Sequence, residues 1–362
     1  MKILYAIQGT GNGHISRARD IIPLLRQKGD LDVLISGTEA EVALDYPVKF
    51  VLKGLSLVFG KKGSIDLGAT FKRINIRHLI KEINDLPVHD YDIIINDFEP
   101  VSAWACRLHR KPCIALSHQA AVVHKHSPRA GNFYPFGKMI LKNYAPCTVQ
   151  YGFHFEQYSK KIYTPVIRNE VRNIATLSGD HYTVYLPAYS DQRISEVIGK
   201  IENVEWHVFS KRSKKSYREG NITVLPISND LFVKSMASSR GILCGAGFET
   251  PAESLFLHKK LMVIPMNGQY EQQYNAASLK SMGIPVLKKL DTGYLEEIRL
   301  WINSDSVVPV HFPDITAKII DEIFEQCAMA SEQFHVTFDT NPSSYKKIKQ
   351  RMIGNILNHS LE

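Results

Sequence analysis

A histidine lies in the loop that follows the first hydrophobic segment of the chain. The segment covers residues 2–7, and the loop reads Gly9-Thr10-Gly11-Asn12-Gly13-His14 before a helical pattern begins. A glycine-rich turn between a strand and a helix lets a phosphate or a sugar approach backbone N–H groups. An imidazole at such a turn titrates near neutral pH and can take a proton from a hydroxyl. His14 is therefore predicted to be a general base, with a turn-stabilising imidazole as the structural alternative.

The first loop departs from two common phosphate-binding motifs. The dinucleotide fingerprint needs a further glycine, and His14 interrupts that pattern. No ribose-binding acid ends the second predicted strand, which closes at Ser36-Gly37, and no Gly-Lys-Ser/Thr follows the turn. A nicotinamide-dependent dehydrogenase and a P-loop enzyme are therefore disfavoured.

An acidic pair supplies candidate partners for the imidazole. Asn96-Asp97-Phe98-Glu99 follows the hydrophobic residues 93–95. A carboxylate beside a catalytic histidine orients the ring and stabilises the imidazolium. Asp97 is nearer the end of the strand and is preferred over Glu99 as the partner of His14. A helix N-cap is the alternative role for either acid.

A second loop of small residues separates the predicted strand 241–244 from a helix. Its sequence is Gly245-Ala246-Gly247-Phe248-Glu249-Thr250-Pro251. Thr250 is predicted as the N-cap and Pro251 as the first helical residue, so that the helix start could bind a diphosphate. Glu253, in the first turns, could accept hydrogen bonds from ribose. The next strand, 261–264, leads to Glu271-Gln272, which suits sugar hydroxyls.

The pattern of elements indicates an α/β protein. Hydrophobic segments typical of parallel strands alternate with helical patterns in two rounds, and a polar, proline-containing hinge at residues 164–169 separates the rounds. We expect two Rossmann-like, doubly wound domains that face each other across a cleft, with ligands at the carboxyl ends of the strands. The predicted domains are residues 1–165 and 166–340, and a basic C-terminal helix within 341–362 is expected to pack back on the first domain. The predicted strands are residues 2–7, 32–35, 93–95, 113–116, 182–186, 204–209, 222–225, 241–244 and 261–264, and helices are predicted at 16–28 and 101–107.

The bulk composition narrows the protein class. The 362 residues are 44% hydrophobic with a net charge of +8, which excludes disorder and favours anionic partners. Basic residues are dispersed apart from the cluster at 211–215, so nucleic acid is not an expected partner. The five cysteines form no C-x-x-C pair, and no apolar run has membrane-spanning length, which predicts a cytoplasmic protein. The apolar and basic residues 57–62 allow peripheral contact with the inner membrane face; a buried strand and charged turn is the simpler alternative.

Two patterns that resemble metal sites are incomplete. Asp90-Tyr91-Asp92 precedes its strand, whereas a metal-binding Asp-x-Asp would follow one. His118, His124 and His126 have no carboxylate or cysteine nearby to complete a site. No metal is predicted. His118 and Gln119 are interpreted as an acceptor-facing polar loop, with ordinary surface histidines as the alternative.

Taken together, the two loops resemble those of GT-B glycosyltransferases of the UDP-glycosyltransferase type, including the lipid-linked N-acetylglucosaminyltransferase of peptidoglycan synthesis. The resemblance spans both halves and is sharpest from residue 241 to 275, supported by residues 9–14. Residues 151–155 and 165–168 resemble a bacterial and archaeal branch of that superfamily.

The resemblance implies a role for each matching position. His14 would be the inverting base with Asp97 as its partner, and the second loop would hold the leaving diphosphate. The donor-binding positions would be Gly11 and Gly13 (phosphates or acceptor), Ala246, Gly247 and Phe248 (amides on the diphosphate), Glu253 (ribose), Glu271 and Gln272 (sugar hydroxyls) and the backbone near Ile227 (uracil).

One departure from the family pattern concerns the leaving group. Cys244-Gly245-Ala246-Gly247 stands where plant-type enzymes have His-Cys-Gly, so no cationic histidine is expected at the diphosphate. The start of the helix after the second loop must therefore stabilise the negative charge of the leaving diphosphate, aided by Arg168 or by residues 211–215. The implied activity is an inverting, metal-independent transfer from a nucleotide sugar, with UDP as the expected nucleotide, to the hydroxyl of a small or lipid-linked acceptor, with no further cofactor. A UDP-N-acetylglucosamine 2-epimerase-like enzyme and a non-catalytic nucleotide-sugar-binding protein are the alternatives.

Overall fold

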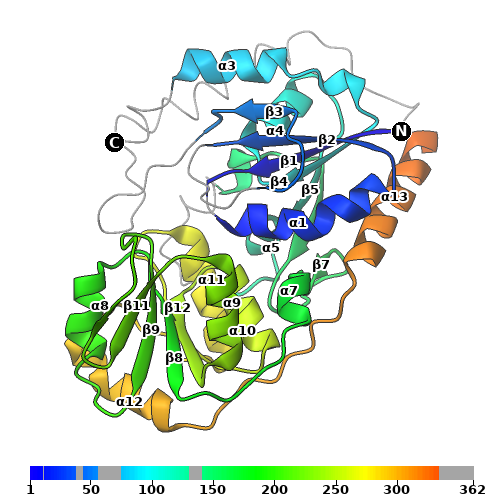
Figure 1. The fold of residues 1–362 in the computed structure, drawn as a ribbon. Coiled ribbons are helices and arrows are strands. Elements are labelled where there is room, and N and C mark those ends of the chain that lie inside the picture. Colours follow the sequence, from blue (N-terminus) through cyan, green and yellow to red (C-terminus); the bar gives the residue numbers. More distant parts are fainter. Residues whose placement is uncertain (11, 38–43, 56–74, 130–140, 334–362) are drawn as a thin grey trace.

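A computed structural model describes residues 1–10, 12–37, 44–55, 75–129 and 141–333, with side chains to residue 328. The described chain forms two lobes, each built on a parallel sheet with helices packed against it (Figure 1). The expected α/β architecture with two doubly wound sheets is confirmed.

The first sheet has seven strands in the order β3-β2-β1-β4-β5-β6-β7, and all of its pairs are parallel. The order reverses between β1 and β4, which is where a doubly wound sheet places its ligand site. The four strands predicted in this half are present, and β3, β6 and β7 were not predicted. The bounds are β1 Lys2–Gln8, β2 Asp30–Ser36, β3 Phe50–Leu52, β4 Ile93–Asp97, β5 Ile114–Ser117, β6 Val149–Phe153 and β7 Ile162–Tyr163.

The second sheet has six strands in the order β10-β11-β9-β8-β12-β13. Its β10–β11 pair is antiparallel and the other pairs are parallel. All five strands predicted in this half are present within a residue or two. The bounds are β8 His181–Tyr185, β9 Glu205–Ser210, β10 Tyr217–Glu219, β11 Ile222–Pro226, β12 Gly241–Gly245 and β13 Lys260–Ile264.

Helices cover the sheets and connect the strands (Figure 1). The first lobe contains α1 Asn12–Arg26, α3 Ile76–Asp85, the 3-10 turn η1 Val88–Asp90, α4 Pro100–Leu108 and α5 His118–Val122. The remaining helices are α7 Asn169–Arg172, α8 Asp191–Ile198, α9 Asn229–Ser238, α10 Glu249–Phe256, α11 Tyr270–Ser281, η2 Thr292–Tyr294, α12 Leu295–Asn303 and α13 Thr316–Gln333.

The central strands do not alternate polar and apolar residues, so each sheet is buried inside its lobe. From Ile3 to Ile7 every residue of β1 is fully buried, because helices cover both faces of the sheet. On one face Ile21 and Leu25 of α1 join this core, and on the other Val101 and Cys106 of α4 pack under the sheet. The carboxyl ends of β1 and β4 are therefore held rigidly at the interface between the lobes.

The chain returns to the first lobe through α13, which lies beside α1 (Figure 1). Lys28 pairs with Asp321 of α13 at 2.5 Å. From β6 and β7, the hydroxyls of Tyr151 and Tyr163 donate to Gln326 and Glu322 of the same helix. Helix α13 thus packs back on the first lobe, and the C-terminal helix predicted within residues 341–362 lies outside the described part of the chain.

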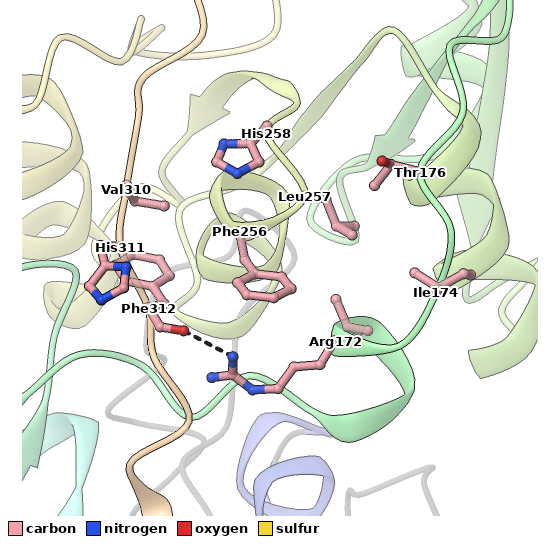
Figure 2. A pocket seen from close by; sticks show the side chains of 10 residues that line it. Arg172, Ile174, Thr176, Phe256, Leu257, His258, Val310, His311 and Phe312 are labelled. Carbon is pink, nitrogen blue, oxygen red and sulfur yellow. Dashed lines mark hydrogen bonds between the residues drawn. The ribbon is translucent and has the colours of Figure 1, made fainter.

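The two segments that cross between the lobes lie side by side. The first crossing includes α7, and the second runs through residues 310–312. Figure 2 shows the Arg172 guanidinium donating to the carbonyl of Phe312, at 2.9 Å, beside a cavity of about 400 Å³. The Arg172 guanidinium also lies 4.9 Å from the centre of the Phe256 ring at the end of α10. These contacts tie both crossing segments to the end of α10.

Candidate functional site

Helix α1 begins earlier than its sequence pattern suggested. It starts at Asn12, whereas a start near residue 16 was predicted, so Gly13 and His14 lie in its first turn. The glycine loop therefore leads directly into helical backbone. His14 is held on a helix beside the carboxyl ends of β1 and β4, with 13% of its side chain exposed.

His14 and Asp97 are in direct contact. His14 Nδ1 lies 2.9 Å from Asp97 Oδ1, and the Asp97 carboxylate is fully buried at the end of β4. This contact favours the tautomer with the proton on Nδ1, which leaves the Nε2 lone pair as the proton acceptor. Burial lowers the pKa of His14, but the charge and hydrogen bond of Asp97 outweigh burial, and the net pKa lies above the ordinary value.

A second cation shares the Asp97 carboxylate. Arg17, one helical turn after His14, is 2% exposed, and its Nη2 donates to both Asp97 oxygens at 2.7 and 2.8 Å. Burial raises the pKa of Asp97, but the charges of Arg17 and His14 exceed that effect and hold the pKa below its usual value. Asp97 is therefore an ionised carboxylate between two cation-forming groups.

The two acids considered as partners of His14 have different roles. Glu99 is the N-cap of α4, and its carboxylate accepts from the amides of Val101 and Ser102 at 2.7 and 2.6 Å. The N-cap interpretation thus fits Glu99 and the partner interpretation fits Asp97. Phe98 between them has a φ of +59°, a strained value for a non-glycine residue. Its ring stacks on Tyr144 at 4.7 Å, beside His14.

Gln119 continues the row of polar groups into the second lobe. Its Nε2 lies 3.4 Å from His14 Nε2 and donates to Glu271 Oε2 at 3.0 Å. Glu271 is in the first turn of α11, beyond β13. Asp97, His14, Gln119 and Glu271, four positions singled out in the sequence, are therefore brought together in one hydrogen-bonded row across the lobes.

His118 does not lie where the sequence suggested. It is 1% exposed, its Nδ1 lies 2.8 Å from the Phe153 carbonyl and its Nε2 2.7 Å from Asn275 Oδ1. Burial lowers its pKa to about 4, so the ring is neutral. The ring also stacks on Phe248 at 3.8 Å. The prediction of an acceptor-facing His118 is wrong, because both ring nitrogens are already bonded inside the interface.

The second loop leads into α10 two residues earlier than predicted. The helix begins at Glu249 with Phe248 at the N-cap, so Thr250 and Pro251 lie inside the first turn and the predicted Thr250 cap is wrong. Proline is accepted there because the first amides of a helix lack intrahelical partners. The side chains of Ala246 and Phe248 are buried, whereas a Cβ at Gly247 would meet no atom within 4 Å. Among the described residues, the amides of Gly247 and Phe248 donate to no backbone carbonyl outside regular structure.

Glu253 is engaged in a buried ion pair. Its two carboxylate oxygens accept from Arg168 Nε and Nη2 at 2.5 and 2.7 Å, and Glu253 is 2% exposed. Burial raises the pKa of Glu253 in spite of the neighbouring guanidinium. Arg168 lies on the first crossing between the lobes, so this pair anchors the hinge to α10. A ribose contact at Glu253 would have to share this carboxylate with Arg168.

Three other residues predicted to bind the donor are Gln272, Ile227 and Gly11. Gln272 Oε1 accepts from the Met266 amide at 2.9 Å, which fixes the loop after β13. Ile227 follows β11, and its amide donates to the Ser210 carbonyl at 3.0 Å, so its carbonyl is the backbone group left for a base. Gly11 lies outside the described residues.

The two glycine loops meet through Glu249 and Arg17, neither of which was predicted from the sequence to be a site residue. Glu249 Oε1 accepts from Arg17 Nη1 at 2.7 Å, and a Cβ on Gly13 would overlap the Glu249 carboxylate. Glycine at position 13 therefore makes room for an acid from the other lobe. Arg17 could have been found from its i+3 spacing to His14. Because α1 starts at Asn12, this spacing places both residues on one face of the helix.

The described residues contain no group of three or more His, Cys, Asp or Glu side chains arranged to hold a metal ion. No helix in the described ranges is long and apolar enough to cross a bilayer. Residues 57–62, considered for membrane contact, lie outside the described chain.

Comparisons with known proteins agree with the fold described above. Solved structures similar to this chain include MurG of Acinetobacter baumannii (TM-score 0.54, 14% identity, 90% of this chain and 99% of that chain covered). They also include the spinosyn rhamnosyltransferase SpnG (0.55, 12%, 93% and 100%) and a UDP-N-acetylglucosamine 2-epimerase (0.53, 13%, 91% and 97%). These likenesses show a GT-B-like fold. No curated protein matches the sequence. The sequence profile described as Glycosyl transferase family 1 matches residues 1–301, and the chain therefore belongs to this family of glycosyltransferases, which use nucleotide-sugar donors.

Proposed function

We propose that this glycosyltransferase transfers its sugar with inversion, and that His14 is the base that deprotonates the acceptor hydroxyl. The observation that carries the proposal is the 2.9 Å contact between His14 and Asp97. It orients the ring so that Nε2 faces Gln119 at the interface of the lobes. Attack by the deprotonated hydroxyl on the anomeric carbon expels the nucleoside diphosphate and inverts that carbon.

The leaving diphosphate is assigned to the loop before α10. The open space at Gly247 supports this assignment, as do the amides of Gly247 and Phe248, which donate to no backbone carbonyl outside regular structure in the described chain. They lie at the start of α10, and a helix start attracts anions. Arg17 supplies a guanidinium one turn from His14 and already holds a carboxylate oxygen of Glu249 there. Because this guanidinium is already paired with Asp97 and Glu249, we propose that the start of α10 offsets the leaving charge and that the reaction needs no metal ion.

UDP is the proposed nucleotide and a hexose the proposed sugar. Glu271 and Gln272 lie in the first turn of α11, and the Gln272 side chain lies near Gly245 in the loop before α10, which supports contacts with sugar hydroxyls. A lipid-linked or small hydroxyl compound in the cytoplasm is the proposed acceptor. Membership of a glycosyltransferase family favours transfer over epimerisation or simple binding.

A panel of UDP-, dTDP- and GDP-sugars tests donor binding by the shift in melting temperature, because a ligand of the folded state stabilises it. We expect UDP-sugars to raise the melting temperature and Gly247→Asp to abolish the shift, since the added carboxylate fits the open space but repels a diphosphate. Gly247→Asn is the control with the same shape and no charge. A shift that survives Gly247→Asp would refute the proposed diphosphate position. An acceptor product with the donor's anomeric configuration, read by NMR coupling constants, would refute inversion.

A further inference from the structure

A cavity of about 900 Å³ opens at the end of the first sheet away from His14. Ile93, Ile114 and Val149, the first residues of β4, β5 and β6, line it. Asp97, by contrast, is the last residue of β4. Because parallel strands point the same way, the cavity and the proposed catalytic groups lie at opposite ends of the sheet. The cavity is therefore separate from the proposed catalytic groups, and its role is independent of the proposed function.

The wall of this cavity is mainly apolar. Helix α13 closes one side through Ile323 and Cys327, and buried residues at the strand starts form the floor. Burial raises the pKa of the Cys327 thiol, so this side chain contributes as a small neutral hydrophobe. The apolar lining includes Ile94, Ile114, Val149 and Ile323.

Positive charge gathers around the same cavity. Arg107, Arg110, Lys111 and Lys161 line it, and Asp92 is the one acid in the lining. The Asp92 carboxylate already accepts from the Lys2 amide at 2.7 Å. Neither Arg107 nor Lys111 forms an ion pair with a carboxylate in the described part of the chain. An apolar cavity beside Arg107 and Lys111, which have no carboxylate partner in the described chain, matches a ligand that has a hydrocarbon body and an anionic head.

We propose that this cavity binds one molecule of a single-chain anionic amphiphile, such as a long-chain carboxylate. The hydrocarbon chain lies between the strand starts and α13, and the head group lies among Arg107, Lys111 and Lys161. The volume falls in the range of about 300–1,000 Å³ that encloses a small-molecule ligand.

Calorimetric titration with octanoate, decanoate and dodecanoate, each below its micelle concentration, tests the proposal. The dissociation constant should fall roughly fourfold for each added methylene. Dodecanol, which lacks the charge, should bind about tenfold more weakly than dodecanoate. The variant Arg107→Ala/Lys111→Ala should raise the dissociation constant of dodecanoate to that of dodecanol. The dissociation constant of dodecanol should not change in this variant. The control variant Lys214→Ala/Lys215→Ala removes the same amount of positive charge from the second lobe and should change neither dissociation constant.

A cavity-filling variant separates the cavity from the protein surface. Cys327→Trp should abolish dodecanoate binding while the melting temperature shows that the protein is folded. In the wild type, dodecanoate should also slow alkylation of the half-buried Cys147, followed by peptide mass spectrometry. Absence of saturable binding, an unchanged alkylation rate, or binding only to vesicles of anionic phospholipid would overturn the proposal.

Discussion

Arg17 and Glu249 join the two lobes of this glycosyltransferase through a 2.7 Å ion pair. Arg17 also holds both oxygens of Asp97, the partner of His14, and Glu249 is the first residue of α10 after the proposed diphosphate loop. One guanidinium thus connects the proposed base with the proposed donor loop. A change at the donor loop that moves Glu249 must alter the surroundings of His14.

The pH dependence of kcat/KM should report His14. Its pKa is raised, and an imidazolium cannot accept a proton. Activity should therefore fall as the pH drops through a value above the ordinary histidine pKa of about 6.5. His14→Ala should lower kcat roughly 10²–10⁴-fold and abolish this limb of the profile. A profile that keeps the same limb in His14→Ala would assign the limb to another group.

Asp97→Asn should move the acidic limb of the kcat/KM profile to lower pH. Without the carboxylate, burial and the Arg17 charge both lower the pKa of His14, so the limb shifts to lower pH. The rate on the plateau should still fall, because nothing then fixes the proton on Nδ1. A plateau equal to that of the wild type would show that Asp97 does not orient the ring.

Arg17→Gln should move the limb to higher pH. The guanidinium lowers the pKa of His14, so its removal leaves Asp97 to raise that pKa further. A residue with only a packing role would lower the rate at every pH without moving the limb. Arg17→Lys keeps the charge and loses the bidentate contact, so it should restore the position of the limb better than it restores the rate. An unmoved limb in Arg17→Gln would exclude electrostatic positioning.

Gly13 and Glu249 should be energetically coupled. Because a Cβ at position 13 overlaps the end of the Glu249 side chain, Gly13→Ala should push that carboxylate away from Arg17. Glu249→Ala removes the same contact directly. A double-mutant cycle on kcat/KM should therefore give a coupling energy of roughly 0.5–3 kcal/mol. Pairing Gly13→Ala with the distant Arg240→Ala should give additive effects, and equal additivity for both pairs would contradict the contact.

The sequence predicted the sheets well because central parallel strands read as unbroken hydrophobic runs. β1, β4 and β12 are of this kind, and each was placed within about two residues. The strands β3 and β7 were missed because three residues and two residues carry too little pattern. The contact between His14 and Asp97 followed from topology, since β1 and β4 are adjacent, the loop after β1 leads to His14, and Asp97 ends β4.

The surroundings of His118 and Glu253 could not be predicted, because their partners come from distant parts of the chain. His118 looked like a loop histidine, and only Asn275 from the second lobe shows why it is buried. Glu253 looked free for ribose until Arg168 from the hinge reached it. His118 and Asn275 are 157 positions apart in the sequence, and Arg168 and Glu253 are 85 positions apart. No local sequence pattern predicts contacts over such distances.

The buried pair of Arg168 and Glu253 should matter for stability, whereas a surface pair should not. Arg168→Ala leaves an uncompensated carboxylate in a site that is 3% exposed, which costs roughly 3–5 kcal/mol. Arg240→Ala breaks a pair with Asp180 whose side chains are 54% and 94% exposed, and should cost about 0–1 kcal/mol. Urea unfolding of the two variants beside the wild type measures both values. The double variant Arg168→Met/Glu253→Leu removes both charges and should recover much of the loss, because the desolvation penalty disappears with them. If Arg168→Ala costs no more than Arg240→Ala, the pair is not buried in solution and Glu253 is open to ligand.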